Sequence, residues 1–283
     1  MDILFFTHLL NSILMIIMPI GLAIYLTYIW KPGWRIWFIG AATFILSQIG
    51  HIPFNMEVTQ LLKMTPLAAM TSDQSRWFNI IFLGLSASVF EEGARYLVLK
   101  FWLKDARSWR KSVVFGAGHG GVEAIILGGF ALFTFFQFTG LRNINLENVL
   151  PAAELDSIQQ QVTAYWSADW TLSLMGSLER FFTIPIHIAC AVLVMQAFTR
   201  KQGYWLGLAI LYHAVVDSCV VASVGVLSTY GSEAVVGFFA LLGLALIFVL
   251  RQPEPLDDSK AEIHVDKKVV PTLSTENNDR LHQ

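Results

Sequence analysis

Residues 112–138 read SVVFGAGHGGVEAIILGGFALFTFFQF, a run of apolar and small residues interrupted by one histidine, His119, and one carboxylate, Glu123. About 20 consecutive apolar residues are enough for a helix to cross the hydrocarbon core of a bilayer. The stretch therefore predicts a membrane-spanning helix with two ionisable side chains at membrane depth. Such side chains are costly in lipid, face the protein interior and are candidates for a functional site.

Other apolar stretches lie on both sides of this one. Of the 283 residues, 55% are hydrophobic and only 14% are charged, well below the charged share of soluble domains. We predict an all-α, polytopic transmembrane helix bundle with about seven spanning helices. The predicted spans are 3–29, 35–56, 77–103, 112–138, 170–198, 204–227 and 233–250.

Basic residues are concentrated in alternate loops between these spans. They are Lys31, Arg35, Lys104, Arg107, Arg110, Lys111, Arg200, Lys201 and Arg251. Cytoplasmic loops carry an excess of Lys and Arg, so this pattern predicts an external N-terminus and a cytoplasmic C-terminus. We therefore expect a multi-pass protein of the cytoplasmic (plasma) membrane.

Two polar segments lie outside the spans. Residues 139–169 form an external segment in which 151–166 can make a short helix on the membrane. Residues 1–251 are predicted to form the transmembrane domain, and 252–283, polar and with three prolines, a disordered cytoplasmic tail. The net charge of −2 gives no reason to expect nucleic acid as a partner. Both cysteines lie in apolar runs, which favours a packing role over a disulfide or a thiolate metal site.

Ionisable residues recur inside four of the spans. They are Glu91, Glu92, Arg95, His119, Glu123, His187, His213 and Asp217. With a rise of 1.5 Å per residue, most of them lie roughly 10–20 Å from the cytoplasmic ends of their helices. We predict that they form one polar layer between the cytoplasmic interface and the midplane. His8, His51, Glu179 and Arg180 fall in the outer half, and we interpret them as structural or interfacial residues.

This set of side chains favours hydrolytic metal chemistry. Histidines and carboxylates bind zinc at catalytic sites, and a metal or a carboxylate can activate water. We predict a divalent metal, with zinc favoured, held by ligands from the set His119, Glu123, His187 and His213. The sequence contains no G-x-S-x-G, no H-E-x-x-H and no G-x-G-D paired with Y-D, which disfavours serine, site-2-type and aspartyl proteases. Any single pair of these residues could instead serve only to join two helices.

The motifs also carry a family resemblance. E-E-G-A-R at 91–95, F-G-A-G-H-G-G-V-E at 115–123, the lone His187 and H-A-V-V-D at 213–217 resemble the YhfC-type intramembrane metalloproteases. These are similar to the superfamily of CAAX prenyl proteases, bacteriocin-processing proteins and PrsW proteases. The resemblance covers about residues 77–227, the protease-like core, and it implies a seven-helix membrane protease.

The resemblance also implies residue roles. Glu91 and Glu92 match a diacidic motif whose glutamate activates the attacking water. His119 matches a histidine that binds metal or holds that water, and His213 and Asp217 match a motif that acts as ligand or oxyanion stabiliser. Arg95 follows one residue sooner than in the prenyl protease pattern E-E-x-x-x-R, which leaves open which glutamate is the base. We favour Glu91, because it lies four residues, one helical turn, from Arg95.

The predicted function is that of an intramembrane metalloendopeptidase, a hydrolase that cleaves membrane-anchored substrates in a bacterial cytoplasmic membrane. The predicted catalytic residues are Glu91, Glu92, Arg95, His119, His213 and Asp217. One alternative is a non-catalytic membrane scaffold or immunity-type protein, because the superfamily includes a scaffold subunit of gamma-secretase. Another is a small-solute or ion transporter, for which repeats and broken helices in both halves would be expected and are not evident. The sequence leaves the oligomeric state open.

Overall fold

The computed structural model describes residues 2–65 and 69–254 of the chain. It divides into two units, 1–252 and 253–283, and every helix described below belongs to the first. The predicted disorder of the tail concerns residues that, from 255 onward, lie outside the described part.

Long α-helices account for the first unit, which confirms the all-α bundle. They are α1 (Ile3–Trp30), α2 (Trp34–Lys63), α3 (Ser72–Phe101), α4 (Trp109–Arg142), α6 (Met175–Thr199), α7 (Tyr204–Ser223) and α8 (Thr229–Val249). A shorter helix, α5 (Ala152–Ser167), and three 3-10 turns, η2 (Lys104–Ala106), η3 (Leu146–Asn148) and η4 (Leu172–Leu174), connect them. Among the described residues, six of the long helices are apolar enough to cross a membrane. The seventh, α3, which carries Glu91, Glu92 and Arg95, is not among these six.

The ends of α2 and α3 differ from the predicted spans, because the apolar runs and the hydrogen-bonded helices end at different residues. α3 begins at Ser72 because Thr71 and Gln74 form a capping box, in which each side chain bonds the backbone N–H of the other. α2 continues to Lys63, seven residues beyond the predicted end at 56. A helix ends where its backbone hydrogen bonds end, and this point need not coincide with the end of an apolar run.

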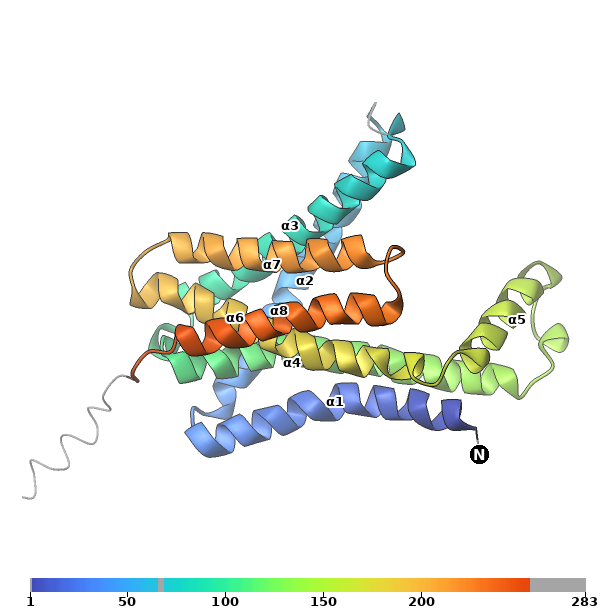
Figure 1. Cartoon of the computed structure of the whole chain (residues 1–283), viewed down its shortest axis with the longest axis horizontal. Helices are drawn as coiled ribbons and strands as arrows, with labels where there is room; N and C mark the ends of the chain where they lie inside the picture. Colours follow the sequence, from blue (N-terminus) through green and yellow to red (C-terminus); the bar gives the residue numbers. More distant parts are fainter. Residues whose placement is uncertain (1, 66–68, 255–283) are drawn as a thin grey trace, which may run out of the picture. The chain divides into compact units, whose positions relative to one another are not determined.

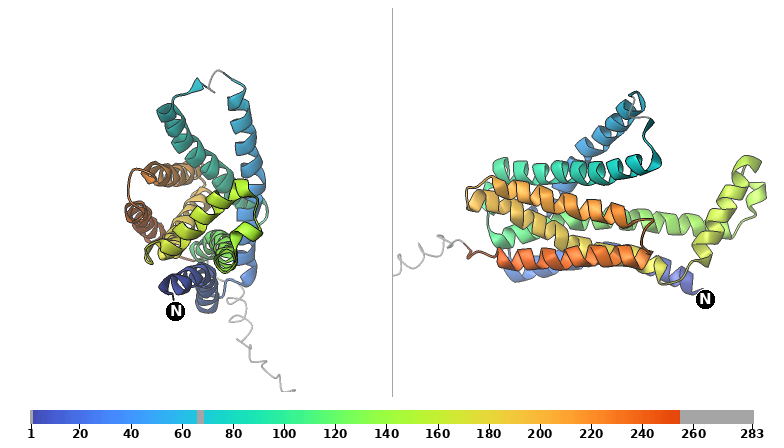
Figure 2. Two further views of the ribbon diagram at one scale, coloured as in Figure 1. Left: turned by 90° about the vertical axis from the view of Figure 1, so that its right-hand side faces the viewer. Right: turned by 45° about the horizontal axis from the view of Figure 1, so that its top comes forward.

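α4, with 34 residues, is the longest helix of the described part of the chain. It packs against α1, α2 and α6, while α3 packs against α7 and α6 against α8. α2 crosses the other helices obliquely, and the end of the α2–α3 pair projects away from the rest (Figures 1 and 2). α6, in turn, contacts α3, α4 and α7, the three other helices that carry the ionisable residues of the predicted layer.

The basic loops gather at one end of the bundle. Arg35 lies 3.7 Å from Asp105, in the loop between α3 and α4, and Arg251 lies over the ring of Trp109 at 5.1 Å. The indole of Trp109 donates a 2.8 Å hydrogen bond to the carbonyl of Ile247 near the end of α8. The loops predicted to be cytoplasmic thus share one side, while the orientation of that side in the membrane stays a prediction.

At the opposite end, α5 projects from the bundle as a separate helix (Figure 1). Its position matches the short helix predicted at 151–166. Tyr165 stacks on His8 of α1 with ring centres 3.9 Å apart, and burial raises the pKa of Tyr165 to about 12. The contact agrees with a structural role for His8.

Candidate active site

Glu91, Glu92 and Arg95 form the charged centre of α3. All three are buried, and Arg95 and Glu92 expose no surface. One guanidinium nitrogen of Arg95 lies 3.3 Å from Glu91 Oε2, and the other donates a hydrogen bond to Glu92 Oε1. Successive residues of a helix point about 100° apart, so the two carboxylates face different neighbours. Glu91 lies nearest to histidines of α4 and α6, whereas Glu92 bonds His213 of α7, which also approaches Glu91.

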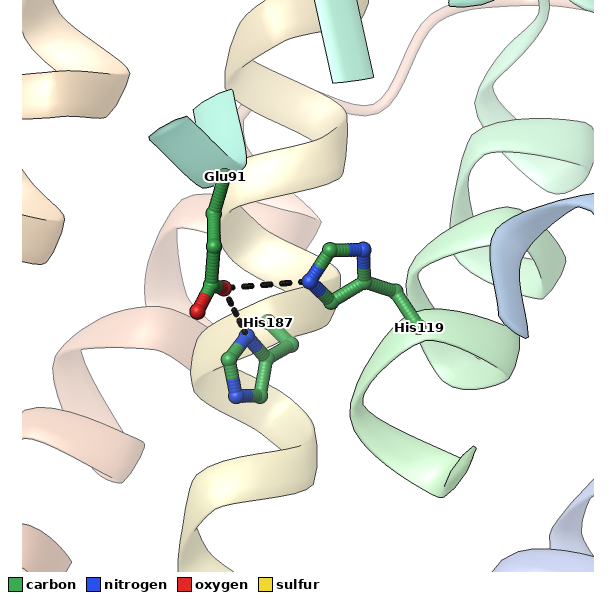
Figure 3. A group of neighbouring side chains, drawn as sticks. All are labelled: Glu91, His119 and His187. Carbon is green, nitrogen blue, oxygen red and sulfur yellow. Dashed lines mark hydrogen bonds and ion pairs between the residues drawn. The ribbon is translucent and has the colours of Figure 1, made fainter. Parts of the chain in front are cut away.

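Three histidines from three helices converge on Glu91 Oε2. His119 Nε2, from α4, lies 3.0 Å away, and His187 Nδ1, from α6, lies 3.8 Å away. His213 Nε2, from α7, lies at 4.0 Å. Figure 3 shows the rings of His119 and His187 turned toward the carboxylate. The structure therefore brings these four residues together, while their depth in the membrane stays a prediction.

Glu92 belongs to a second group, with His213 and Cys190. His213 Nδ1 lies 2.7 Å from Glu92 Oε1, and its other ring nitrogen lies 3.4 Å from Asp217 Oδ2. The donor atoms of Glu92, Cys190 and His213 all lie within 4.8 Å of one another. Cys190 is buried, as its apolar setting predicts, but it lies beside charged groups. Cys219, by contrast, is exposed on α7.

His187 connects this inner centre to an outer charged group. Arg95 donates a 2.8 Å hydrogen bond to His187 Nδ1, and a guanidinium can only donate, so Nδ1 accepts. The ring proton of a neutral His187 then lies on Nε2, which is 2.7 Å from Glu123 Oε2. The other oxygen of Glu123 accepts a 2.6 Å hydrogen bond from Arg180.

The interpretation of His51, Glu179 and Arg180 as residues outside the layer needs correction. Arg180 forms ion pairs with Glu123 and with Glu179. His51, Glu179 and Arg180 all line the same cavity as Glu91. The signal was available, because Arg180 lies seven residues before His187 on α6, and a separation of seven residues returns to the same helix face. The axial position of the Arg180 backbone does not indicate the ion pair with Glu123, because the long arginine side chain extends well away from that backbone.

Sequence reasoning missed Gln48 altogether. This α2 side chain donates a 3.1 Å hydrogen bond to Glu91 Oε1, the oxygen that the histidines leave free. Gln48 also contacts His51, which in turn contacts Ser86 and Asn55. An uncharged residue on a helix outside the family-like core gave no motif to recognise.

Glycines explain how α4 brings His119 so close to the other helices. A Cβ atom at Gly118 would overlap the carbonyl oxygen of Trp37 on α2. At Gly116 it would lie 2.7 Å from the Cα of Ile188, and at Gly120 2.8 Å from the ring of His187. Small residues at these positions let membrane helices approach closely, as the sequence predicts for α4.

A cavity of about 330 Å³ opens beside these groups. Its polar lining comprises His51, Glu91, Glu123, Glu179, Arg180, Thr183, His187, His213 and Asp217. The remaining lining is aliphatic, with Leu83, Ile186, Val216, Val220 and Val236 among its residues. A cavity with apolar walls and a few convergent polar groups is the usual form of a binding site.

The donor atoms fit a divalent cation in chemistry and spacing. Glu91 Oε2, His119 Nε2 and His187 Nδ1 all lie within 4.8 Å of one another. Two ligands of a tetrahedral zinc ion, each about 2.0–2.1 Å from it, are about 3.3 Å apart, close to the separations found here. Arg95 donates a hydrogen bond to the same nitrogen of His187. The guanidinium and a metal ion would therefore compete for the lone pair of His187 Nδ1. Joint ligation that includes Glu123 and His213 stays a prediction.

Comparison with known proteins agrees with this architecture. The family model described as YhfC intramembrane metalloprotease matches residues 14–237, most of the chain. The chain is also 29% identical over 212 residues to the uncharacterized membrane protein YhfC of Bacillus subtilis (strain 168), covering 73% of this chain and 80% of that protein. No solved structure matches. With its helices long and apolar enough to cross a bilayer, the protein is a multi-pass membrane protein, and it belongs to the YhfC intramembrane metalloprotease family.

Proposed function

We propose that this chain is an intramembrane metal-dependent protease that hydrolyses peptide bonds of membrane-anchored substrates, with Glu91 as the group that activates water. The observation that carries the proposal is the convergence of His119, His187 and His213 on one oxygen of Glu91 at the wall of the cavity. A lone structural ion pair would not require histidines from three further helices. The family match supports the same chemistry.

The residues divide the reaction between them. Glu91 accepts a proton from a water molecule as the water oxygen bonds to the carbonyl carbon of the substrate. That proton then goes to the amide nitrogen as the carbon–nitrogen bond breaks, which yields an amine and a carboxylate. His213, beside Glu91 and Asp217, is placed to stabilise the negative charge that develops on the carbonyl oxygen.

The remaining inner groups hold this arrangement. Glu92 and Arg95 expose no surface, and we assign them to fixing Glu91 and His213 rather than to contact with substrate. His119 and His187 would hold a divalent ion, zinc by our proposal, next to Glu91. When bound, such an ion polarises the carbonyl group and makes water more acidic. We further propose that the enzyme acts in a bacterial plasma membrane.

Two isosteric variants on adjacent residues test the assignment. Purified protein in liposomes is given a pool of labelled single-span peptides, and cleavage is followed by mass spectrometry with and without a zinc chelator. We expect Glu91→Gln to reduce cleavage by at least about 100-fold, the usual contribution of a general base. Glu92→Gln should retain weakened cleavage, and Glu57→Gln, exposed on α2, serves as the matched control.

The proposal fails if zinc-loaded wild-type protein cleaves none of the peptides, or if Glu91→Gln cleaves them at the wild-type rate. Either result, obtained with folded protein, would favour the non-catalytic scaffold. If Glu91→Gln abolishes cleavage but the chelator has no effect, Glu91 keeps its role as general base and the metal is excluded from the mechanism.

A further inference from the structure

One face of α2 is polar. It begins beside Glu91 of α3 and continues toward the end of α2 that lies away from the basic loops. Gln48, His51, Asn55 and Thr59 follow one another at intervals of three or four residues, so they share one helix face. Polar side chains on a spanning helix are costly in lipid and need a partner. This face is absent from the family-like motifs and has no role in the proposed chemistry so far.

The face forms an ordered chain of hydrogen bonds. Asn55 Nδ2 lies 2.8 Å from His51 Nε2, and an amide nitrogen can only donate, so His51 carries its proton on Nδ1. That nitrogen lies 3.3 Å from Gln48 Oε1. Gln48 in turn donates to Glu91 Oε1. The chain therefore ends on the carboxylate to which we assign water activation.

Two hollows meet along the same face. A groove of about 410 Å³ follows α2 from Gln48 through His51, Asn55 and Thr59 to Gln60. His51 lines both this groove and the cavity that holds Glu91. The two hollows are therefore adjacent, with one imidazole between them.

Contact between α2 and α3 explains only part of this face. Ser86 of α3 bonds His51, as expected for polar residues that join helices. Beyond that contact, Asn55 Oδ1 is buried and has no partner among the described residues. Buried polar atoms without a protein partner are normally satisfied by water. The groove beside Asn55 supplies the space for it.

We propose that this face of α2 is the route by which water reaches Glu91, with Gln48 as the residue that holds the carboxylate at its inner end. The proposal rests on the proposed function, because hydrolysis inside a bilayer consumes water that lipid does not supply. Water enters from the end of the bundle that carries the α2–α3 loop. Gln48 keeps Oε1 occupied, which leaves Oε2 to the histidines and the attacking water.

Cysteine accessibility tests the route without any need for catalysis. In a Cys219→Ser background, with the buried Cys190 retained, cysteine replaces Gln48 or its neighbour Ile49, and separately Asn55 or its neighbour Phe54. Each pair lies at nearly equal depth, but Ile49 and Phe54 lie on other faces of α2 and are 66% and 42% exposed, on surfaces that we expect to meet lipid. A membrane-impermeant thiol reagent is added to sealed vesicles of each orientation, with Lys63→Cys as the marker for the loop side.

We expect the cysteines at 48 and 55 to react at least about tenfold faster than those at 49 and 54, because the reactive thiolate forms in water and not in apolar surroundings. The reaction should occur from the side that labels Lys63→Cys. Adding Asn55→Trp to the Gln48→Cys protein should slow its labelling. If Gln48→Cys does not fold, the 54 and 55 pair decides.

Equal labelling within each pair, or no labelling at 48 and 55 while Lys63→Cys reacts, overturns the route. Because labelling reports only the presence of water, a protein that is labelled as expected but cleaves nothing would refute the protease and leave the water path standing. A protein that cleaves peptides without this labelling pattern would refute the water route and leave the protease proposal standing.

Discussion

The two halves of α4 are both rich in glycine but differ in how deeply they are buried. From Trp109 to Ala124 the helix is buried almost without a break, whereas beyond Ala124 only Gly128 and Phe135 are buried. Gly116, Gly118 and Gly120 of the first half touch the backbone or side chains of α2 and α6. Gly129 of the second half meets nothing within 4 Å. Glycine content alone therefore does not reveal close packing, which occurs at several glycines of the half that carries His119 but in the second half at Gly128, against Met15 of α1.

The same contrast separates the two arginines of the polar network. Arg95 binds carboxylates that are 7% and 0% exposed, and none of these groups reaches solvent readily. Arg180 binds Glu123 and Glu179, whose side chains are 20% and 37% exposed. The inner network depends mainly on its own members for compensation of charge, since of its charged groups only Glu91 lines the cavity, while all three charged groups of the outer network line it. We infer a fixed inner centre beside a more adaptable outer wall.

Arg95→Ala tests this contrast with the largest expected effect. The change leaves Glu91 and Glu92 buried without their cation, and removal of one partner of a buried ion pair destabilises by roughly 3–5 kcal/mol. The free energy of unfolding in detergent micelles, measured against a denaturing detergent, should fall by that amount or the protein should fail to fold. Unfolding at the wild-type midpoint would show that the inner carboxylates do not depend on Arg95.

Gly118→Ala, compared with Gly129→Ala on the same helix, should give the next largest difference. At Gly118 the added methyl group overlaps the carbonyl oxygen of Trp37, and overpacking of this kind costs about 1–3 kcal/mol. At Gly129 the methyl group meets open space, and alanine should stabilise the helix by up to about 1 kcal/mol. Equal thermal midpoints of the two variants would contradict the tight contact between α2 and α4.

Sequence reasoning located the inner centre well because axial position follows directly from helix rise. Glu91, His119, His187 and His213 were expected at one depth, and three distances of 3.0–4.0 Å to Glu91 Oε2 agree with it. The helices themselves were predictable for the same reason, since long apolar runs have no other way to satisfy the backbone in lipid.

The partners of each side chain were less predictable, because they depend on helix rotation, tilt and side-chain length. Arg180 extends from the outer half to Glu123, and His187 links two charged groups whose connection no motif indicates. Gln48 reaches Glu91 only because α2 packs beside α3, an arrangement that no sequence motif indicates. These features need three-dimensional packing, which a period of 3.6 residues does not specify.

Arg180→Ala should have a smaller effect than Arg95→Ala, on the order of 1 kcal/mol, because partly exposed ion pairs contribute little. Water that enters the cavity can hydrate Glu123 and Glu179 once the guanidinium is gone. The same unfolding measurement serves, with Arg180→Lys as the control that keeps the charge. A loss as large as that of Arg95→Ala would mean that the outer carboxylates depend on their arginine as strongly as the inner ones do.

The smallest effect is expected at the exposed pair of Asp2 and Arg142, where the N-terminus of α1 meets the end of α4. Arg142 donates a 2.7 Å hydrogen bond to Asp2, and this bond, followed by one from the backbone of Leu4, lowers the pKa of Asp2. A carboxyl group with a lowered pKa stabilises the fold above its unfolded pKa, and this contribution is lost as the pH falls through the folded pKa. Arg142→Gln should therefore move the pKa of Asp2 up toward 3.8, as followed by carbon NMR of a labelled Asp2 carboxyl. The unfolding midpoint at neutral pH should fall only slightly, because an exposed carboxylate remains hydrated without its partner. A marked drop in that midpoint would place this pair with the inner network and would remove the distinction between buried and solvated charges on which the comparison rests.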